Sequence, residues 1–321
     1  MKEKYLRSPI PYMGSKYKLL KDLIPLFPKE CDVFVDLFGG SGTVAMNYQG
    51  GGRTIYNEFN HNIVELIKTI VNNNPEELDK YWKAKVEYYK LPNKSTTRKN
   101  PNDDTCFTER QNNYNKMRKD YNSSKERDYR DLYLLSCFSI NHLIRFNSDS
   151  QFNASSGNNS YNEVNFERVK GMHEKFKNIE INEGDALTMD LSFLTDNSFV
   201  YCDCPYLNTE AVYNEKRAFG GWTIESDYKL FKRLEQLNEK GIKWGLSNVF
   251  ENRGKRNDHL IEWCNKNNWA VVHLDRNYNP FSRGLSNNDE VYICNYKINN
   301  DDKKEDNNSI KYSQVDLFDL I

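Results

Sequence analysis

The sequence predicts an α/β fold in which a mainly parallel sheet carries helices on both faces. Apolar, strand-like runs alternate with helical stretches along most of the chain, as expected where helices connect parallel strands through right-handed crossovers. The alternation stops between residues 72 and 175, where helical patterns follow one another. A glycine-rich turn at 39–42 also joins a buried strand to a helix, which is typical of a nucleotide-binding corner. We therefore expect a Rossmann-like sheet with an inserted, mainly helical block.

The individual elements follow from these patterns. Strand-like runs lie at 33–38, 54–57, 179–182, 198–202, 242–247, 270–274 and 290–297. Helical patterns lie at about 15–27, 60–72, 225–240 and 256–268. Inside the inserted block, 81–89 and 110–143 are expected to be helical, separated by the turn-rich stretch 91–104. An insertion of this size at one rim of a sheet is a candidate for substrate recognition.

The composition describes a polar chain with an uneven charge. No stretch of 18 apolar residues and no signal-peptide pattern occurs among the 321 residues, so we expect a cytoplasmic protein with no membrane partner. The seven cysteines include no C-x-x-C pair, which argues for reduced thiols and against a metal site. The net charge is −1, yet residues 81–146 hold fourteen Lys and Arg against eight Asp and Glu. That block could supply phosphate contacts, although a solvated helical face carries a similar excess.

The glycine turn predicts a cofactor site. Gly40 and Gly42 allow a ligand to approach the backbone closely, just before the helical stretch that begins at Thr43. Glu58 follows the second strand, where its carboxylate can accept hydrogen bonds from ribose hydroxyls. Residues 40–45 also fit the dinucleotide fingerprint G-x-G-x-x-A, so this corner alone leaves both NAD and S-adenosylmethionine open.

The tetrapeptide Asp203-Cys204-Pro205-Tyr206 favours the second cofactor. It follows the apolar run 199–202, and a strand end with a turn would explain it without any chemistry. However, the Asp203 carboxylate and the Cys204 carbonyl can accept both hydrogens of an amino group while Tyr206 stacks on the attached ring. Such hydrogen bonds aim the nitrogen lone pair at a methyl donor. Hydride transfer has no use for this arrangement.

With these motifs the chain resembles the DNA N6-adenine methyltransferases of the Dam type, over roughly residues 8–298. Residues 11–16 resemble that family's opening motif, 57–60 its ribose segment, and 184–186 its acidic position facing the donor's adenine. The late strands, 244–248 and 290–296, also match, and the resemblance makes the last one antiparallel. The resemblance implies a catalytic set of Asp203, Cys204, Pro205 and Tyr206. It implies a donor site formed by Tyr12, Gly14, Lys16, Phe38, Gly40, Gly42, Glu58, Asp185 and Asp203.

The inserted block carries a predicted β-hairpin. Residues 140–147 and 151–153 flank the polar turn 148–150, and the pattern is similar to the family's DNA-reading hairpin. The resemblance assigns DNA contacts to Asn141, Leu143 and Arg145, with the arginine reading a guanine edge. Packing on the helices explains the apolar members equally well. The sequence departs from the family pattern at Pro11, at Ile140, at His142 in place of a glycine, and at Ser155. Because of these departures, GATC is a candidate target sequence that the resemblance does not assign.

We therefore expect a DNA adenine-N6 methyltransferase that uses S-adenosylmethionine on a flipped-out base in double-stranded DNA. The catalytic domain comprises 1–72 and 175–298, and the target-recognition insertion spans 73–174. The rival interpretations are an N4-cytosine methyltransferase, which usually has Ser at the position of Asp203, and a methylase of protein or RNA amines, commonly with Asn there. A catalytically idle DNA-binding or decoy protein is the alternative from a different class.

The last residues predict a separate function. Residues 299–308 contain no apolar side chain, so we expect a flexible linker. The following Gln-Val-Asp-Leu-Phe looks like the pentapeptide by which bacterial replication proteins bind the sliding clamp, with Gln314, Leu317 and Phe318 as contacts. A terminal segment that folds back on its own domain is the alternative. The sequence thus predicts DNA as one partner and, through 299–321, a possible bacterial sliding clamp as another.

Overall fold

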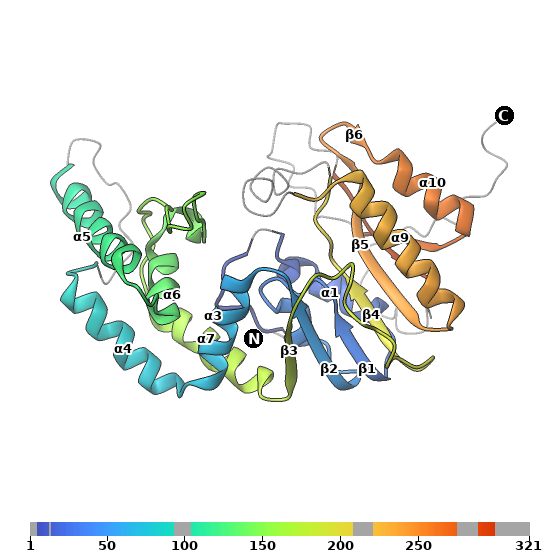
Figure 1. The fold of residues 1–321 in the computed structure, drawn as a ribbon, viewed down its shortest axis with the longest axis horizontal. Coiled ribbons are helices and arrows are strands. Elements are labelled where there is room, and N and C mark those ends of the chain that lie inside the picture. Colours follow the sequence, from blue (N-terminus) through green and yellow to red (C-terminus); the bar gives the residue numbers. More distant parts are fainter. Residues whose placement is uncertain (1–4, 13, 93–103, 208–220, 275–287, 299–321) are drawn as a thin grey trace.

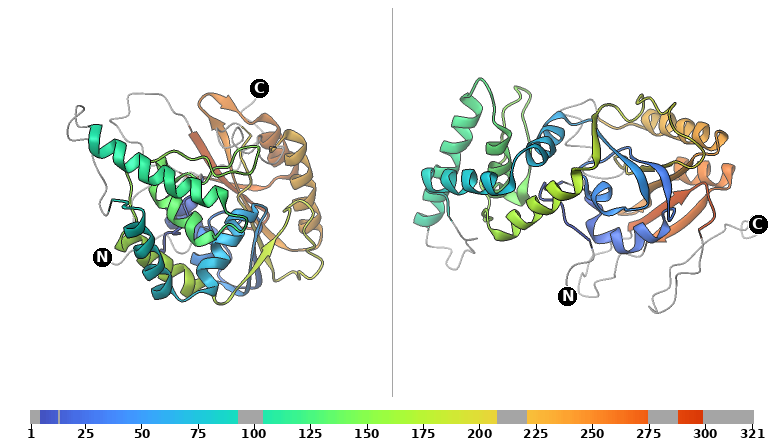
Figure 2. Two further views of the ribbon diagram at one scale, coloured as in Figure 1. Left: turned by 60° about the vertical axis from the view of Figure 1, so that its left-hand side comes forward. Right: turned by 90° about the horizontal axis from the view of Figure 1, so that it is seen from below.

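The chain forms an α/β part and a helical part that lie side by side (Figure 1). A computed structural model describes residues 5–12, 14–92, 104–207, 221–274 and 288–298. Strands and the helices that cover them make up the α/β part, and the helices from the middle of the sequence project from one edge of it (Figure 2). None of the helices within the described ranges combines the length and the apolar character needed to cross a membrane.

A mixed sheet of eight strands organises the α/β part, in the order β3-β2-β1-β4-β5-β8-β7 with β6 paired to β5. The strands from β3 to β5 run parallel, whereas β8 is antiparallel to both β5 and β7. Their bounds are β1 Cys31–Asp36, β2 Gly51–Glu58, β3 Ile179–Glu183, β4 Phe199–Cys202, β5 Lys243–Asn252, β6 Lys255–Arg256, β7 Ala270–Leu274 and β8 Asn288–Cys294. All seven predicted strands are present, and the antiparallel last strand is confirmed. The short β6 was not predicted.

Alternating side chains divide the sheet between two apolar layers. In the register of β1 and β4, Phe34 pairs with Phe199 and Val35 with Val200. The valines face the layer that contains α9 (Ile224–Glu239) and α10 (Asp258–Asn267), whose Phe231 and Trp263 rings stack at 4.2 Å. The phenylalanines face the N-terminal turns, including Leu20 and Phe27. Burial on both faces explains why these strands are apolar without interruption.

The N-terminal turns differ from the single helix predicted over 15–27. Three short pieces form instead: η1 (Lys16–Leu19), α1 (Leu20–Leu23) and η2 (Ile24–Leu26). Pro25 lies in the last piece. Its ring lacks a backbone N–H donor and crowds the carbonyl of the preceding turn, so a regular α-helix cannot continue through it.

Helices make up most of the inserted block. After α3 (His61–Asn72), which precedes the block, they are α4 (Pro75–Tyr88), α5 (Asp104–Ser123), α6 (Tyr129–Phe138), η3 (Ile140–His142) and α7 (Glu163–Phe176). The prediction of one helix over 110–143 is wrong, because two separate helices, α5 and α6, cover this range. A new helix begins after Asp128, whose side chain accepts a hydrogen bond from the Arg130 N–H at 2.9 Å. The unpredicted α7 begins at a capping box formed by Asn162 and Asn165.

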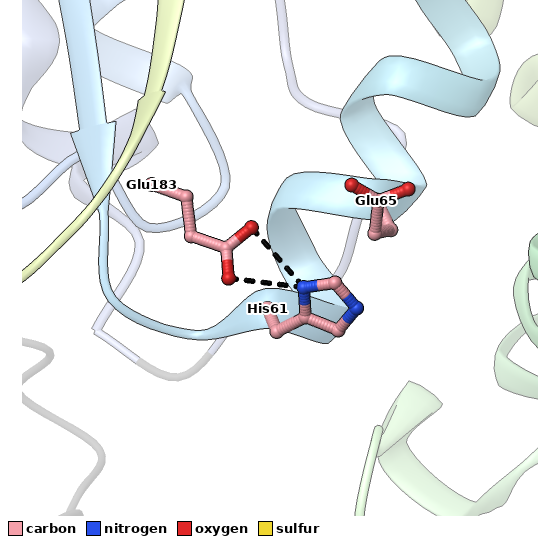
Figure 3. A group of neighbouring side chains, drawn as sticks. All are labelled: His61, Glu65 and Glu183. Atoms are coloured by element: carbon pink, nitrogen blue, oxygen red, sulfur yellow. Dashed lines mark hydrogen bonds and ion pairs between the residues drawn. The ribbon is translucent and has the colours of Figure 1, made fainter.

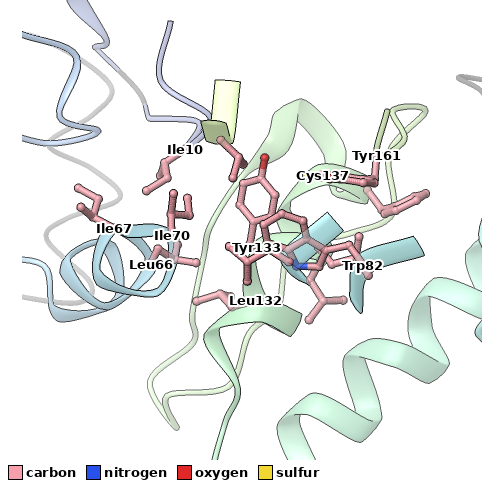
Figure 4. Packing of buried hydrophobic residues seen from close by; sticks show 14 of the residues in the cluster. Ile10, Leu66, Ile67, Ile70, Trp82, Leu132, Tyr133, Cys137 and Tyr161 are labelled. Atoms are coloured by element: carbon pink, nitrogen blue, oxygen red, sulfur yellow. The ribbon is translucent and has the colours of Figure 1, made fainter. Parts of the chain in front are cut away.

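The helical block shares its core with the sheet. One apolar cluster includes Met46 and Tyr56 beside the glycine turn, Ile10 from the N-terminal segment, and Trp82 and Tyr133 from the insertion. Figure 4 shows these last three with neighbours from α3 packed into one continuous layer. The rings of Trp82 and Tyr133 are 4.5 Å apart. This cluster fixes the insertion against the sheet.

Candidate active site

The glycine turn forms a tight corner between β1 and the short helix α2 (Thr43–Asn47). Gly40 and Gly42 have φ angles of +51° and +72°, in the left-handed region that favours glycine. A Cβ atom on Gly42 would lie 2.6 Å from the Phe176 ring, so this position also has no room for a side chain. The Tyr12 ring lies directly against Gly40. The structure thus brings Tyr12, Gly40 and Gly42 together as the resemblance implied.

Glu58 ties this corner to the end of β2. One carboxylate oxygen accepts a hydrogen bond from the Gly40 N–H and the other from the Asn60 N–H, both at 2.8 Å. Burial raises the pKa of Glu58, and the backbone donors oppose that rise. A carboxylate has about four lone-pair positions, so these two bonds leave capacity for ligand hydroxyls.

Asp36, which the sequence analysis did not select, closes the same corner from β1. Its Oδ2 accepts a hydrogen bond from the Ala45 N–H of α2 at 3.0 Å. Burial, with the nearby charge of Asp203, raises the pKa of Asp36 to about 8. The signal was present in the sequence: an acid ends an otherwise apolar buried strand, directly before the glycine turn.

Lys16 connects the N-terminal motif to the end of β4. Its Nζ lies 2.6 Å from Asp203 Oδ1 and donates to the Gly14 carbonyl at 3.1 Å. The lysine side chain is 5% exposed and that of Asp203 19%, so solvent screens this pair only weakly. Burial raises the pKa of Asp203, and Lys16 is the main opposing influence. The ammonium group therefore helps to keep this carboxyl group ionised.

Tyr206 and Glu290 complete the cluster around Lys16. The Tyr206 hydroxyl donates to Asp203 Oδ1 at 3.2 Å, and its oxygen lies 3.5 Å from Glu290 Oε1. Lys16 Nζ is 5.0 Å from the centre of the Tyr206 ring and 3.9 Å from Glu290. Glu290, on β8, is 1% exposed and was not selected from the sequence. Only the pairing of β8 with β5 brings this late residue to the end of β4.

Acidic groups outnumber basic groups in this cluster. Asp36, Glu58, Asp203 and Glu290 influence one another or Lys16 through their charges. Because burial raises the pKa of Asp36 to about 8, this carboxyl group is protonated at neutral pH, and attraction for a positively charged ligand depends on the other carboxyl groups. Glu58 keeps acceptor capacity for ligand hydroxyls.

The remaining catalytic candidates form the wall next to Asp203. Cys204 is buried, and its sulfur accepts a hydrogen bond from the Asn248 side chain at 3.6 Å. Burial raises the pKa of Cys204 well above its usual range, so its thiol is not a nucleophile. Pro205 is partly exposed beside it. Phe38 contacts the edge of Trp222 at 5.5 Å, at the described end of the segment 207–222 that follows the motif.

Asp185 follows Gly184, whose N–H donates to the Glu58 carbonyl at 3.1 Å, so it lies next to the end of β2. It is exposed at the end of β3, where its Oδ1 accepts a hydrogen bond from the Leu187 N–H at 2.8 Å. A cavity of about 510 Å³ beside it is bordered by β2 and β3. Among the described residues, the lining of this cavity includes no other member of the predicted donor site.

One surface cluster in the described ranges has ligands suited to a cation. His61 Nδ1 lies 3.0 and 3.1 Å from the two oxygens of Glu183, and Glu65 lies one helical turn along α3 (Figure 3). His61 is 60% exposed, and Lys68 pairs with Glu65 at 2.8 Å. These contacts are those of ordinary surface ion pairs, so we assign no metal to the cluster.

The predicted hairpin forms, with a modified first strand. Phe146 and Phe152 pair antiparallel, and the Asn147 N–H donates to the Gln151 carbonyl at 2.9 Å. The preceding segment 140–142 is a 3₁₀ turn, so the strand predicted from residue 140 is wrong there. Leu143 packs partly against the helical core, in agreement with the packing interpretation.

The polar candidates of the hairpin are exposed. Arg145 donates to the side chain of Asn153 at 2.8 Å and to its carbonyl at 3.0 Å, which orients the guanidinium group along the hairpin. Asn141 is exposed with a φ angle of +51°. Both residues lie on the wall of a groove of about 980 Å³.

This groove runs between the N-terminal segment, α3, the hairpin and α7. Tyr12 lines it, as does Arg145 in the hairpin, so the groove joins the glycine corner to the insertion. Its described lining contains four arginines and no acidic residue: Arg7, Arg127, Arg145 and Arg168. In a chain with a net charge of −1, this concentration of positive charge marks a surface for a polyanion.

Comparison with known proteins identifies the family. The family model of the D12 class N6 adenine-specific DNA methyltransferase matches residues 12–278. The chain belongs to this family. The match includes the glycine corner, Asp203 and the whole helical insertion.

Several modification methylases are similar to this D12 chain. It is 36% identical over 307 residues to modification methylase StsI of Streptococcus sanguinis, and 32% identical over 301 residues to type II methyltransferase M.FokI of Planomicrobium okeanokoites. It is 30% identical over 291 residues to modification methylase LlaI of Lactococcus lactis subsp. lactis. The alignments cover 92%, 91% and 90% of this chain but 44%, 43% and 43% of those proteins. The chain thus spans less than half the length of these relatives.

The prediction for the tail concerns residues outside the described ranges, because the whole of 299–321, with Gln314, Leu317 and Phe318, lies there.

Proposed function

We propose that this chain transfers the methyl group of S-adenosylmethionine to N6 of adenine in double-stranded DNA. The observation that carries the proposal is the cluster at the end of β4, where Asp203 meets Lys16 and Tyr206. A partly exposed carboxyl group beside an aromatic ring is suited to hold a flat base by its amino group. Membership of the D12 class supports adenine over cytosine as that base.

The contacts of Asp203 with Lys16 and Tyr206 suggest how the carboxylate is used. Lys16 and Tyr206 both contact Oδ1, so the amino group of the base would be received through Oδ2. The Cys204 carbonyl would accept the second amino hydrogen. With both hydrogens held, the nitrogen lone pair points away from the ring and toward the electrophilic methyl group that the bound donor supplies. The excess proton leaves after the attack, so no histidine base is required.

The glycine corner is the proposed donor site. Tyr12 and Gly40 would form its floor, Glu58 would accept hydrogen bonds from the ribose, and the surrounding carboxylates would favour the positive sulfonium. We place Gly14, Lys16, Phe38 and Gly42 in the supporting wall. Asp185 is retained as a contact to the donor's adenine on the strength of the resemblance alone.

The target-recognition function is proposed for the insertion, 73–174, and the catalytic function for 1–72 and 175–298. Adenine N6 is hidden in a duplex, so the base must rotate out of the stack, at a cost of a few kcal/mol. The arginine-lined groove could hold the duplex backbone while Asn141, Leu143 and Arg145 contact bases. The similarity to modification methylases favours a restriction-modification role.

One incubation tests the activity. The protein is mixed with tritiated S-adenosylmethionine and duplex DNA, and the DNA is digested to nucleosides. Label in N6-methyl-2′-deoxyadenosine is the expected result, and label in N4-methyl-2′-deoxycytidine would favour the cytosine rival. Unlabelled DNA would favour an idle binding protein or a methylase of protein or RNA. Calorimetry with S-adenosylmethionine and with NAD separates the two cofactors; tight NAD binding would reverse the assignment.

Clamp binding by the tail remains a separate prediction. A labelled peptide of residues 309–321 should bind bacterial sliding clamp, and replacement of Leu317 and Phe318 by Ala should remove that binding. The same double variant should leave methylation of free oligonucleotides unchanged. Failure of both the peptide and the intact chain to bind clamp would eliminate this function.

A further inference from the structure

Side chains of α5 cover the outer edge of the hairpin. The second segment of the hairpin, residues 150–154, pairs with the first through Gln151 and Asn153, which bond to Asn147 and Arg145. In an antiparallel pair, alternate residues bond to the partner segment, so the backbone groups of the residues between them face the other edge. Those groups, at positions 150, 152 and 154, need hydrogen-bond partners from outside the hairpin.

The helix α5 supplies these partners in a regular row. Asn122 bonds to both backbone groups of Phe152: its side-chain amide donates to the carbonyl and its side-chain oxygen accepts from the N–H, each at 2.9 Å. One and two turns earlier, Arg118 and Tyr114 each donate to the Ala154 carbonyl at 3.0 Å. Side chains four residues apart lie on one face of a helix, so this face takes the place of a third strand.

The helix that holds the hairpin is itself fixed to the rest of the molecule. Tyr114 and Met117 of α5 are at most 1% exposed and belong to the apolar cluster that reaches the glycine corner. Arg127, just after α5, donates to the Ser150 carbonyl and so holds the turn of the hairpin as well. The hairpin is therefore anchored to a rigid part of the fold along its whole outer edge.

Asn122 is connected to Arg145 through two consecutive residues. Phe152 bonds to Asn122 on the outer edge, and the next residue, Asn153, holds Arg145 on the inner edge. The Asn153 side chain accepts from Arg145 Nε at 2.8 Å, and the Asn153 carbonyl accepts from the guanidinium group at 3.0 Å. The position of this guanidinium group thus depends on the contact between α5 and the hairpin.

We propose that Asn122 is a specificity-determining positioning residue, which holds Arg145 in place to read a base of the DNA target. The inference deepens the proposed function and rests on it, because that function supplies the contact between the hairpin and DNA. A guanidinium group recognises guanine through two hydrogen bonds at once, so its distance and angle to the base must be well defined. A two-stranded hairpin alone is only marginally stable, and Asn122 restricts its movement.

Selection of bound duplexes from a pool of randomised sequence measures the preference of wild type, Asn122→Ala, Arg145→Ala and the double variant. Arg145→Ala identifies the base pair that the arginine reads. At this pair, the preference of Asn122→Ala should be about threefold to tenfold weaker than that of wild type, which corresponds to the net contribution of about one hydrogen bond. The double variant should discriminate no less than Arg145→Ala, because Asn122 acts through the arginine.

Two further variants separate positioning from a purely structural role. Asn122→Asp keeps an oxygen for the Phe152 N–H and should retain more of the preference than Asn122→Ala. Asn112→Ala is the matched control, since Asn112 is exposed on another face of α5, and it should behave as wild type. Urea unfolding and affinity for one fixed duplex of unrelated sequence are measured on the same proteins. Both should stay near wild type in Asn122→Ala.

Three results would overturn the proposal. They are wild-type preference in Asn122→Ala, losses of preference that add in the double variant, and equal weakening of binding to every duplex with reduced stability. The last result would show that Asn122 only supports the fold.

The proposed methylation can fail or succeed separately. If wild type methylates adenine and Asn122→Ala keeps its sequence preference, the positioning role is wrong and the activity stands. If wild type binds DNA with a preference that Asn122→Ala weakens, but transfers no methyl group, the activity is wrong and the positioning role stands.

Discussion

Lys16 Nζ lies 2.6 Å from Asp203 Oδ1, and this pair joins the N-terminal motif to the carboxyl end of β4. Both side chains are largely shielded from solvent, and Lys16 also donates to the Gly14 carbonyl. The lysine is therefore placed to control the charge of the carboxylate proposed to hold the base.

Removing the ammonium group should shift the pH dependence of methyl transfer. Burial raises the pKa of Asp203 and Lys16 opposes that rise, so Lys16→Met should raise this pKa further. Because the ionised carboxylate is the form that accepts the amino hydrogens, the acidic limb of the kcat profile should move to higher pH. Lys18→Met, on the exposed side of the same turn, is the control. An unmoved acidic limb would argue against the pairing.

Asp203→Asn should reduce methyl transfer by about 10²–10³-fold. The amide keeps one accepting oxygen but loses the negative charge, and its NH₂ group would face the amino group of the base. Donor affinity, measured by calorimetry, should fall by less than the rate of methyl transfer does. Cys204→Pro should stay active, because position 204 is proposed to act through its carbonyl. If Asp203→Asn transfers methyl groups at a rate within tenfold of wild type, the catalytic assignment of Asp203 is wrong.

Glu290 should act as a positioning residue for Tyr206 and Lys16. Glu290→Leu removes the oxygen next to the Tyr206 hydroxyl and the charge facing Lys16, and should lower kcat by about 10²-fold. Glu290→Gln keeps an accepting oxygen and should retain more of the activity. KM for DNA should remain near wild type in both. Equal activity of all three proteins would mean that the residue only fills space.

Arg145→Ala should relax sequence preference at one guanine of the target. Loss of a bidentate contact to a guanine costs about 1–3 kcal/mol of discrimination. The measurement is the relative rate of methylation on oligonucleotides that differ at single positions. Arg53→Ala provides the control, because Arg53 pairs with Glu180 on an exposed edge of the sheet. Equal weakening on every sequence would make Arg145 a phosphate contact.

Asp36 predicts a pH dependence of stability. Its pKa is about 8 in the folded protein and near 3.8 in the unfolded chain, so the folded state holds a proton that the unfolded state releases. The contribution of this bound proton to the free energy of unfolding is fully present below pH 4 and is lost as the pH rises through 8. Asp36→Asn should remove that loss, measured by urea unfolding at pH 5, 6.5 and 8. The exposed Asp196→Asn should keep the wild-type profile, and a parallel decline in Asp36→Asn would refute the prediction.

The sheet could be predicted from the sequence because its strands are buried on both faces. Uninterrupted apolar runs such as 199–202 have few alternative structures in a chain with this alternation. The glycine corner could also be predicted, because the turn needs left-handed backbone at positions 40 and 42, which few residues other than glycine tolerate. Glu58 was selected from its position after a strand-like run, and Lys16 from the family resemblance alone.

Other features depend on contacts between distant segments. Glu290 reaches Tyr206 only through the pairing of β8 with β5, and no local pattern marks that proximity. The helix α7 begins at an asparagine capping box, where we predicted no helix. The break between α5 and α6 follows from capping by Asp128, which competes with the helical periodicity on either side.

The apolar cluster that runs from Met46 and Tyr56 through Ile10 to Trp82 has a consequence for how new specificities arise. A module joined to its neighbour by a short polar linker can be exchanged whole between relatives. In this fold, an insertion taken from a relative would carry apolar side chains that pack well only against the sheet of the protein from which it came. Changes of target should therefore accumulate as individual substitutions on the exposed hairpin, while the helices beneath it stay matched to the sheet.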